Sequence, residues 1–252
     1  MINLNKIKII NKLILTCVIG IIFASSLLSF YKDRTNILKK LGFVDQKKPN
    51  YEISEEDIFW ANEIMKGGYI LHFRHAERDK WIDVQMYDAL ETDVHDKGIN
   101  QSRLAENDYF SEAVCLNKRG TVQAKAMREH LENINFPIGF IISSPICRSR
   151  QTAEIVFDGY DELDRDLVHR GPYNQTKSEH VKDLISLYKS LPIEMSKNTI
   201  VSGHNGTLAP EMFKNDVNEV NLIYRDKVGL EEGGFVVISK KNNELYLEHV
   251  FH

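Results

Sequence analysis

The chain of 252 residues is poor in cysteine, proline and tryptophan, with 3, 6 and 2 copies respectively. So few cysteines cannot build a disulfide-rich scaffold, and their spacing fits no zinc motif. The 32 basic and 36 acidic residues give a formal net charge of −4, which argues against nucleic acid as the main partner. Internal repeats and low-complexity segments are also lacking. With 42% hydrophobic residues, the chain is expected to fold as one large or two small soluble domains.

A single long apolar stretch lies near the N-terminus. Residues 1–12 contain three lysines and no acid, and residues 13–30 contain no charge at all. This order is typical of a secretory signal peptide or an N-terminal membrane anchor, and a stretch that is apolar all round does not suit a core helix. We therefore expect residues 1–30 to be a cleaved signal or a retained anchor. The membrane contact would run through residues 13–30, and the rest would lie on the periplasmic or extracytoplasmic side.

The remainder is predicted to be a linker and one domain. Residues 31–53 are polar and resemble a tether, and residues 54–252 form the predicted domain, with a polar insertion at about 79–115. Cys115 and Cys147 are expected to pair only if this domain lies outside the cytoplasm, because disulfides persist in oxidising compartments.

Short apolar strands alternate with helices along the predicted domain. Strands are predicted at 69–73, 139–143 and 199–202, with a hairpin at 234–239 and 244–250. Helices are predicted at 54–67, 122–131, 148–157 and 181–188, and another is expected to begin after His204, within 205–213. This alternation predicts an α/β fold, a three-layer α/β/α sandwich around a mostly parallel sheet.

Arginine and histidine follow three of the predicted strands. Arg74 and His75 follow the first strand, Arg148 follows the second, and His204 follows the third. The carboxyl ends of parallel strands meet at one edge, where ligands bind. Guanidinium groups bind phosphate oxygens, a neutral histidine can attack phosphorus, and a second, charged histidine can stabilise the developing charge. The sequence therefore predicts a pocket for a phosphorylated molecule, aided by a helix N-terminus after His204 and needing no metal or other cofactor.

Four segments in order resemble those of the histidine phosphatase superfamily, which contains the phosphoglycerate mutases and many phosphatases. The segments are LHFRHAER, LNKRGTVQA, ISSPICRSRQTAE and VSGHNG. Ala76 stands where the family has glycine, and Asn117 stands where it has threonine. The resemblance implies a phosphoglycerate mutase-like fold.

The resemblance also implies roles for individual residues. His75 would be the nucleophile, Arg74 and Arg148 would hold the phosphate, and His204 would be the second histidine of the pocket. The RHAER variant behind an export segment, with Asn205 after His204, is most similar to the enterobacterial lipopolysaccharide core heptose phosphatase group. That similarity would make a phosphorylated small molecule or an envelope glycan the partner.

The proton donor for the leaving group stays open at this stage. Many superfamily members have glutamate in a Leu-x-Glu context, and Leu167-Val168-His169 puts His169 at that position. The rival acids are Glu77, Glu162, Asp164 and Asp166. Neighbours of the motif residues are assigned to substrate binding: Glu77, Arg78, Arg170, Asn205 and Gly206.

The other histidines match no motif. His72 is expected to be a packed or solvent-facing strand residue, and the remainder are expected at the surface: His95, His130, His180, His249 and His252.

Three functions are compatible with these features. The first is a phosphatase that hydrolyses a phosphomonoester through a phosphohistidine, outside the cytoplasm. The second is a non-catalytic module that binds a phosphorylated ligand, which the missing glutamate favours. The third is a phosphoglycerate-type mutase, which an export segment disfavours because glycolytic substrates are cytoplasmic. The sequence contains no signal for the oligomeric state.

Overall fold

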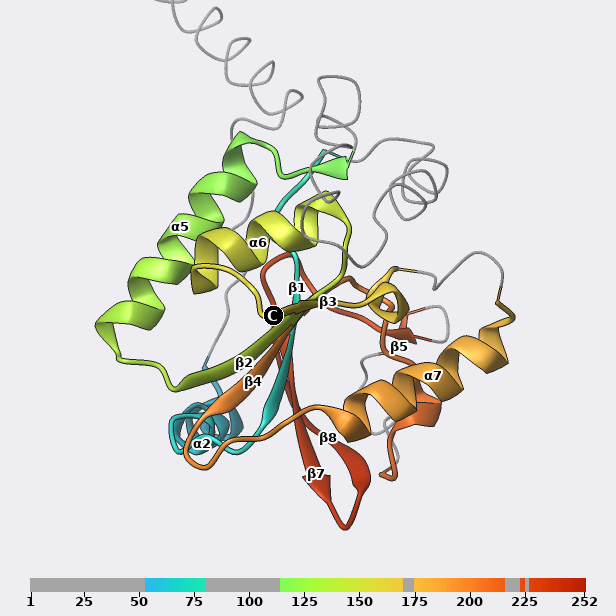
Figure 1. The fold of residues 1–252 in the computed structure, drawn as a ribbon. Coiled ribbons are helices and arrows are strands. Elements are labelled where there is room, and N and C mark those ends of the chain that lie inside the picture. The colour runs from blue at the N-terminus through green and yellow to red at the C-terminus, as the bar shows by residue number, and fades with distance from the viewer. Residues whose placement is uncertain (1–52, 80–113, 170–174, 216–222, 225–226) are drawn as a thin grey trace, which may run out of the picture. The chain divides into compact units, whose positions relative to one another are not determined.

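A six-stranded mixed sheet organises the domain (Figure 1). The computed structural model describes residues 53–79, 114–169, 175–215, 223–224 and 227–252, and Ser54–His252 forms one compact unit. The strand order is β3-β2-β4-β1-β7-β8. The parallel strands are β1 (Ile70–Arg74), β2 (Ile138–Ser143), β3 (Glu162–Leu163) and β4 (Asn198–Gly203). An antiparallel hairpin completes the sheet with β7 (Phe235–Lys241) and β8 (Glu244–Phe251).

Helices cover both faces of the sheet. Helices α2 (Glu55–Ile64), α5 (Lys118–Asn133) and α6 (Cys147–Phe157) pack on one face, around Leu71 and Phe73. Helix α7 (Lys177–Ser190) packs on the other, around Ile70 and Val201 (Figure 1). Strand β1 thus sends alternate side chains into two cores. The three layers and the mostly parallel sheet confirm the predicted fold class.

Capping residues set several boundaries where the sequence predicts them. Ser54 caps α2 and exchanges hydrogen bonds with Asp57, and α2 ends before Gly67, whose φ is +76°. Asn242 and Asn243 have φ values of +52° and +60°, which suits the tight turn of the predicted hairpin. Four short elements complete the described chain: η1 (Arg165–Leu167), η2 (Pro210–Met212), β5 (Ile223–Tyr224) and β6 (Lys227–Val228).

The prediction of a helix that begins after His204 is wrong. The chain turns at Gly206, whose φ of +84° is not helical, and only the three-residue η2 follows. Pro210 lacks the N–H that a helix interior needs. No α-helix N-terminus therefore follows His204 to face an anion.

A disulfide joins Cys115 to Cys147, with 4.8 Å between their Cα atoms. Both residues are buried against Val114. Cys147 is the first residue of α6 and precedes Arg148, so the bridge ties the chain before α5 to the arginine-bearing turn. The pairing that the sequence analysis made conditional on an exported domain is present.

The predicted signal or anchor, nearly all of the linker and most of the insertion at 79–115 lie outside the described residues. Within the part of the chain that the structure describes, no helix is long and apolar enough to cross a membrane.

Candidate active site

Strand register brings the predicted site residues together at one edge of the sheet. Arg74 pairs with Gly203 across β1 and β4, and the His75 N–H donates to the Gly203 carbonyl oxygen at 3.0 Å. The rings of His75 and His204 consequently lie with their centroids 5.4 Å apart. Arg148 is close enough for its charge to lower the pKa of both histidines. We call Arg74, His75, Arg148 and His204 the arginine–histidine cluster.

His75 has the protonation state that a nucleophile requires. Its Nδ1 lies 2.7 Å from the Ala76 carbonyl oxygen, which can only accept, so Nδ1 carries the proton. The lone pair of the neutral ring is then on Nε2. Burial lowers the pKa of His75 well below its usual value, and the charge of Arg148 lowers it further. His75 is therefore neutral at physiological pH, with Nε2 available to attack.

His204 is held at one nitrogen and left open at the other. Nε2 lies 2.9 Å from Ser144 Oγ and 3.3 Å from Ser149 Oγ, whereas Nδ1 is buried with no hydrogen-bond partner among the described residues. Burial and then the charge of Arg148 lower its pKa well below the usual value. His204 is thus neutral before an anion enters, unlike the charged histidine expected from the sequence. A phosphate dianion beside it would favour its protonated form.

Arg148 lies in the first turn of α6 with 1% of its surface exposed. Its carbonyl oxygen accepts from Thr152 Oγ at 2.7 Å, and that same Oγ accepts from the Ala76 N–H at 3.0 Å. The α6 turn and the loop that carries His75 are therefore joined through Thr152. Arg150, which the sequence analysis did not single out, is fully buried, and its Nε donates to the Pro145 carbonyl oxygen at 2.8 Å.

Arg74 is oriented by a loop near the C-terminal end of the chain. Its Nη1 donates to the Leu230 carbonyl oxygen at 2.6 Å, and its Nη2 pairs with Glu232 Oε1 at 2.9 Å. Its Nε is buried with no hydrogen-bond partner among the described residues, so the Nε–H is not used by the protein. Sequence reasoning missed Glu232, because its segment adjoins Arg74 only through the antiparallel pairing of β1 with β7.

His169 also reaches the cluster. Its ring centroid lies 6.0 Å from that of His204, and the residue is half-buried. Two rival acids are placed differently: Glu162 is exposed on β3, and the Asp164 carboxylate accepts from the Asp166 N–H to start η1. Of these candidates, the structure brings His169 to His204.

Glu77, predicted to bind substrate, is braced against the start of α5. Its carboxylate accepts from Asn117 Nδ2 at 3.1 Å and pairs with Arg119. Its backbone touches Gly120 so closely that a Cβ there would lie 1.9 Å from the Glu77 carbonyl oxygen. Gln123 accepts from the Glu77 N–H at 2.9 Å and donates to the Glu232 carbonyl oxygen at 2.7 Å. The LNKRGTVQA segment therefore clamps two loops that adjoin the cluster.

The other predicted substrate-binding residues have mixed placements. The Nη1 of Arg78 donates to the Asp79 carbonyl oxygen at 2.8 Å, and the charge of Arg78 contributes to the lowered pKa of His75. Asn205 Oδ1 accepts from the Leu230 N–H at 2.9 Å, which supports the carbonyl that holds Arg74. Gly206 supplies the turn after His204, and Arg170 lies outside the described residues.

Two histidines expected at the surface are buried, so that prediction is wrong for them. His180 donates through Nε2 to the Asp166 carbonyl oxygen at 2.7 Å, and His249 lies 2.8 Å from Asp57 Oδ1. Each satisfies a partner that only the tertiary fold brings near. His130 and His252 are exposed as expected, His72 is packed, and His95 lies outside the described residues.

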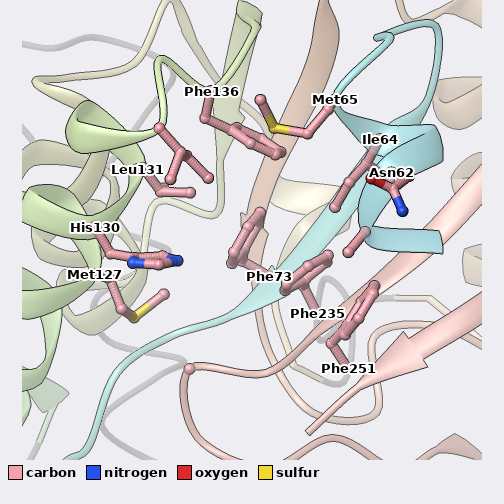
Figure 2. A pocket seen from close by; sticks show the side chains of 13 residues that line it. Asn62, Ile64, Met65, Phe73, Met127, His130, Leu131, Phe136, Phe235 and Phe251 are labelled. Carbon is pink, nitrogen blue, oxygen red and sulfur yellow. The ribbon is translucent and has the colours of Figure 1, made fainter. Parts of the chain in front are cut away.

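A cavity of about 470 Å³ lies on the other side of β1 from His72 (Figure 2). We call it the apolar cavity. Its lining residues come from α2, α5 and the strands β1, β7 and β8, and they include Phe73, Phe235, Phe251, Met127 and Leu131. It offers no cationic cluster for a phosphate. Among the described residues, no group of three or more histidines, cysteines or acids is arranged to hold a metal ion.

A family model supports the interpretation of this geometry. The model described as histidine phosphatase superfamily (branch 1) matches residues 109–167. That stretch includes Arg148, and the structure brings His75 and His204 to it from outside the match. Within residues 109–167, the chain is similar to the histidine phosphatase superfamily. At the level of the family, this supports a phosphatase-type hydrolase.

Solved structures of histidine phosphatases are similar at low identity. A protein histidine phosphatase SixA complexed with tungstate is 14% identical, with 73% of this chain and 96% of that chain covered and a TM-score of 0.43. A putative phosphohistidine phosphatase SixA from Agrobacterium tumefaciens is 17% identical, with 74% and 98% covered and a TM-score of 0.44. A mycobacterial glucosyl-3-phosphoglycerate phosphatase is 14% identical, with 72% and 97% covered and a TM-score of 0.45. None of the curated proteins matches the sequence.

Proposed function

We propose that the domain hydrolyses a phosphomonoester through a phosphohistidine at His75. The observation that carries the proposal is the neutral, buried His75, with Nδ1 bound to the Ala76 carbonyl oxygen and Nε2 free to attack beside Arg148. A low-dielectric site with fixed cations stabilises a transferring phosphoryl group more than water does. The Nε–H of Arg74 and the Nδ1 of His204 would contact the phosphoryl oxygens.

The reaction has two displacements on phosphorus. In the first, the Nε2–P bond forms and the bond from phosphorus to the ester oxygen breaks, which releases the alcohol once its oxygen gains a proton. In the second, water attacks phosphorus, the N–P bond breaks, and inorganic phosphate leaves with His75 neutral again. Each step needs one proton transfer, and water is the only co-reactant.

We assign that proton transfer to His169. It is half-buried and stands beside His204, whereas Glu162 is exposed and Asp164 is engaged in starting η1. An imidazole can donate to the leaving oxygen and then accept from the attacking water. A leaving group of low pKa needs less proton donation. Hydrolysis of substrates with such leaving groups should therefore be slowed least by substitution of His169.

We also propose that the domain works outside the cytoplasm, on a phosphorylated small molecule or an envelope glycan. Residues 1–30 have the composition of a signal or anchor. The Cys115–Cys147 disulfide supports an oxidising compartment. Protease accessibility of the domain in intact cells tests the location, and protection from an external protease would contradict it.

Turnover of p-nitrophenyl phosphate by the full chain in detergent tests the reaction. We expect His75→Ala to retain less than about one thousandth of the wild-type rate, with no phosphoenzyme. The matched control is His130→Ala, an exposed histidine on α5, which should keep full activity. An acid-labile, base-stable phosphoenzyme in the wild type would identify the phosphohistidine.

Two other results would favour a different function. Orthovanadate binding without any turnover would favour the non-catalytic module. Transfer of phosphate between two positions of a phosphoglycerate, faster than hydrolysis, would favour a mutase.

A further inference from the structure

A buried histidine outside the cluster makes direct contact with it. His72 lies on β1 with none of its surface exposed, two residues before Arg74. Its Nδ1 lies 2.6 Å from Tyr188 Oη, and its Nε2 lies 3.2 Å from the carbonyl oxygen of His204. Tyr188 belongs to α7 and is also fully buried. The superfamily motifs quoted above give neither His72 nor Tyr188 a role.

The partners of His72 determine where its single proton lies. The His204 carbonyl oxygen can only accept, so Nε2 must donate and Nδ1 must accept. The Tyr188 hydroxyl then has to donate to Nδ1. Burial lowers the pKa of His72 to about 4 and raises that of Tyr188 well above its usual value. Across the physiological pH range, Tyr188 therefore donates a hydrogen bond to His72, and His72 donates one to the His204 carbonyl oxygen.

The backbone beside His204 is shaped to receive this ring. A Cβ at Gly203 would lie 2.6 Å from Cε1 of His72, so only glycine lets β4 approach so closely. His204 is then held at two ends, at its carbonyl by His72 and at its Nε2 by Ser144 and Ser149. Its Nδ1 is the nitrogen left for a ligand.

We propose that Tyr188 and His72 are positioning residues that set the distance and angle of His204 relative to His75 during phosphoryl transfer. This inference rests on the proposed function. Neither side chain touches substrate, and both act through the backbone of His204. Small displacements of a catalytic group cost about ten- to hundredfold in rate.

Three variants of the full chain test the proposal with p-nitrophenyl phosphate. Tyr188→Phe deletes only the donor, and His72→Leu deletes both contacts; each should lower kcat about ten- to hundredfold with KM changed less than threefold. His72→Gln keeps one donor and one acceptor and should recover most of kcat. The matched control is Thr199→Val on β4. It also removes a buried hydroxyl, which donates to the Pro192 carbonyl oxygen. It should leave kcat unchanged.

Nitrogen-15 spectra of the imidazoles give a readout that does not depend on turnover. We expect His72 in the Nε2–H form from pH 5.5 to 8, and we expect Tyr188→Phe to shift the His204 signals of the orthovanadate-bound protein. An Nδ1–H form of His72, or unshifted His204 signals together with wild-type kcat in Tyr188→Phe, would overturn the inference. If the wild type shows no turnover, the proposed function fails, whereas the spectra still test whether Tyr188 and His72 position His204.

Discussion

The arginine–histidine cluster and the apolar cavity adjoin consecutive residues of one strand. Phe73 lines the cavity, and Arg74 and His75 belong to the cluster. The cavity is bordered by Phe73, Phe235 and Phe251, whose rings stack in sequence at 4.6 and 4.7 Å between centroids. The cluster instead buries an arginine and two histidines, with exposures of 1% for Arg148, 4% for His75 and 1% for His204.

The two regions are held together by different kinds of interaction. Apolar packing tolerates changes that conserve volume, because dispersion and burial are not directional. Buried polar groups require specific partners, since an unpaired one costs about 1–3 kcal/mol. Substitutions in the cluster should therefore have large and specific effects, and substitutions in the cavity should have small ones.

Apart from loss of the nucleophile, the largest effect is expected for Arg148→Met, which keeps an unbranched though shorter side chain and removes its charge. We expect kcat/KM to fall about 10²- to 10³-fold, the cost of removing one group that stabilises the transferring phosphoryl. Arg128→Met is the matched control, because Arg128 pairs at the surface of α5 with Glu132 and Asp158. Its activity should be unchanged. Equal losses in both variants would remove the distinction between the cluster and the surface.

Stability should fall as the pH drops from 7 to 5.5. His72, His75 and His204 have pKa values lowered by burial, so they stay neutral in the folded chain but bind protons when it unfolds. The unfolded state then binds more protons, and stability rises with pH below about 6.5. The free energy of unfolding in urea should fall over this interval, and His72, whose pKa is about 4, should account for about 1 kcal/mol of the loss. Constant stability from pH 7 to 5.5 would show that these histidines charge in the folded state.

A smaller effect is expected for Glu232→Gln. The amide keeps the shape of the contact with Arg74 Nη2 but loses its charge, so Arg74 should be held less firmly while repulsion of a phosphate dianion is relieved. We expect kcat to fall about tenfold and KM to decrease. Glu231→Gln is the control, because Glu231 influences Arg74 only by charge at a distance. Indistinguishable kinetics for the two variants would contradict a positioning role for Glu232.

The smallest effect is expected in the apolar cavity. Met127→Leu conserves volume, so the free energy of unfolding should change by less than about 1.5 kcal/mol and kcat by less than twofold. Met127 Sδ would lie 3.4 Å from a Cβ at Gly233, in the loop that holds Arg74. A larger change in kcat would therefore show that the cavity and the cluster are coupled through Gly233.

The sequence predicts the residues that directly follow each strand. It does not predict contacts that depend on the order of strands in the sheet or on helix packing. Arg74, His75, Arg148 and His204 were found because each follows an apolar strand, and parallel strands share one carboxyl edge. Glu232 and Tyr188 were not found, because the neighbours of β1 and the partner face of α7 follow from tertiary packing. The burial of His180 and His249 cannot be predicted from the sequence for the same reason. The helix predicted within 205–213 does not form, because the chain turns at Gly206 with a φ of +84° and Pro210 lacks the N–H of a helix interior.

The antiparallel direction of β7 has a consequence for how this domain could diversify. Parallel strands deliver the loops that follow them to the cluster, whereas β7 delivers the loop that precedes it, with Leu230 and Glu232. Arg74 therefore takes its orientation from a stretch more than 150 positions away that shares no residue with the four signature segments. Substitutions in residues 229–234 can therefore change how Arg74 is held without changing any residue of the four signature segments.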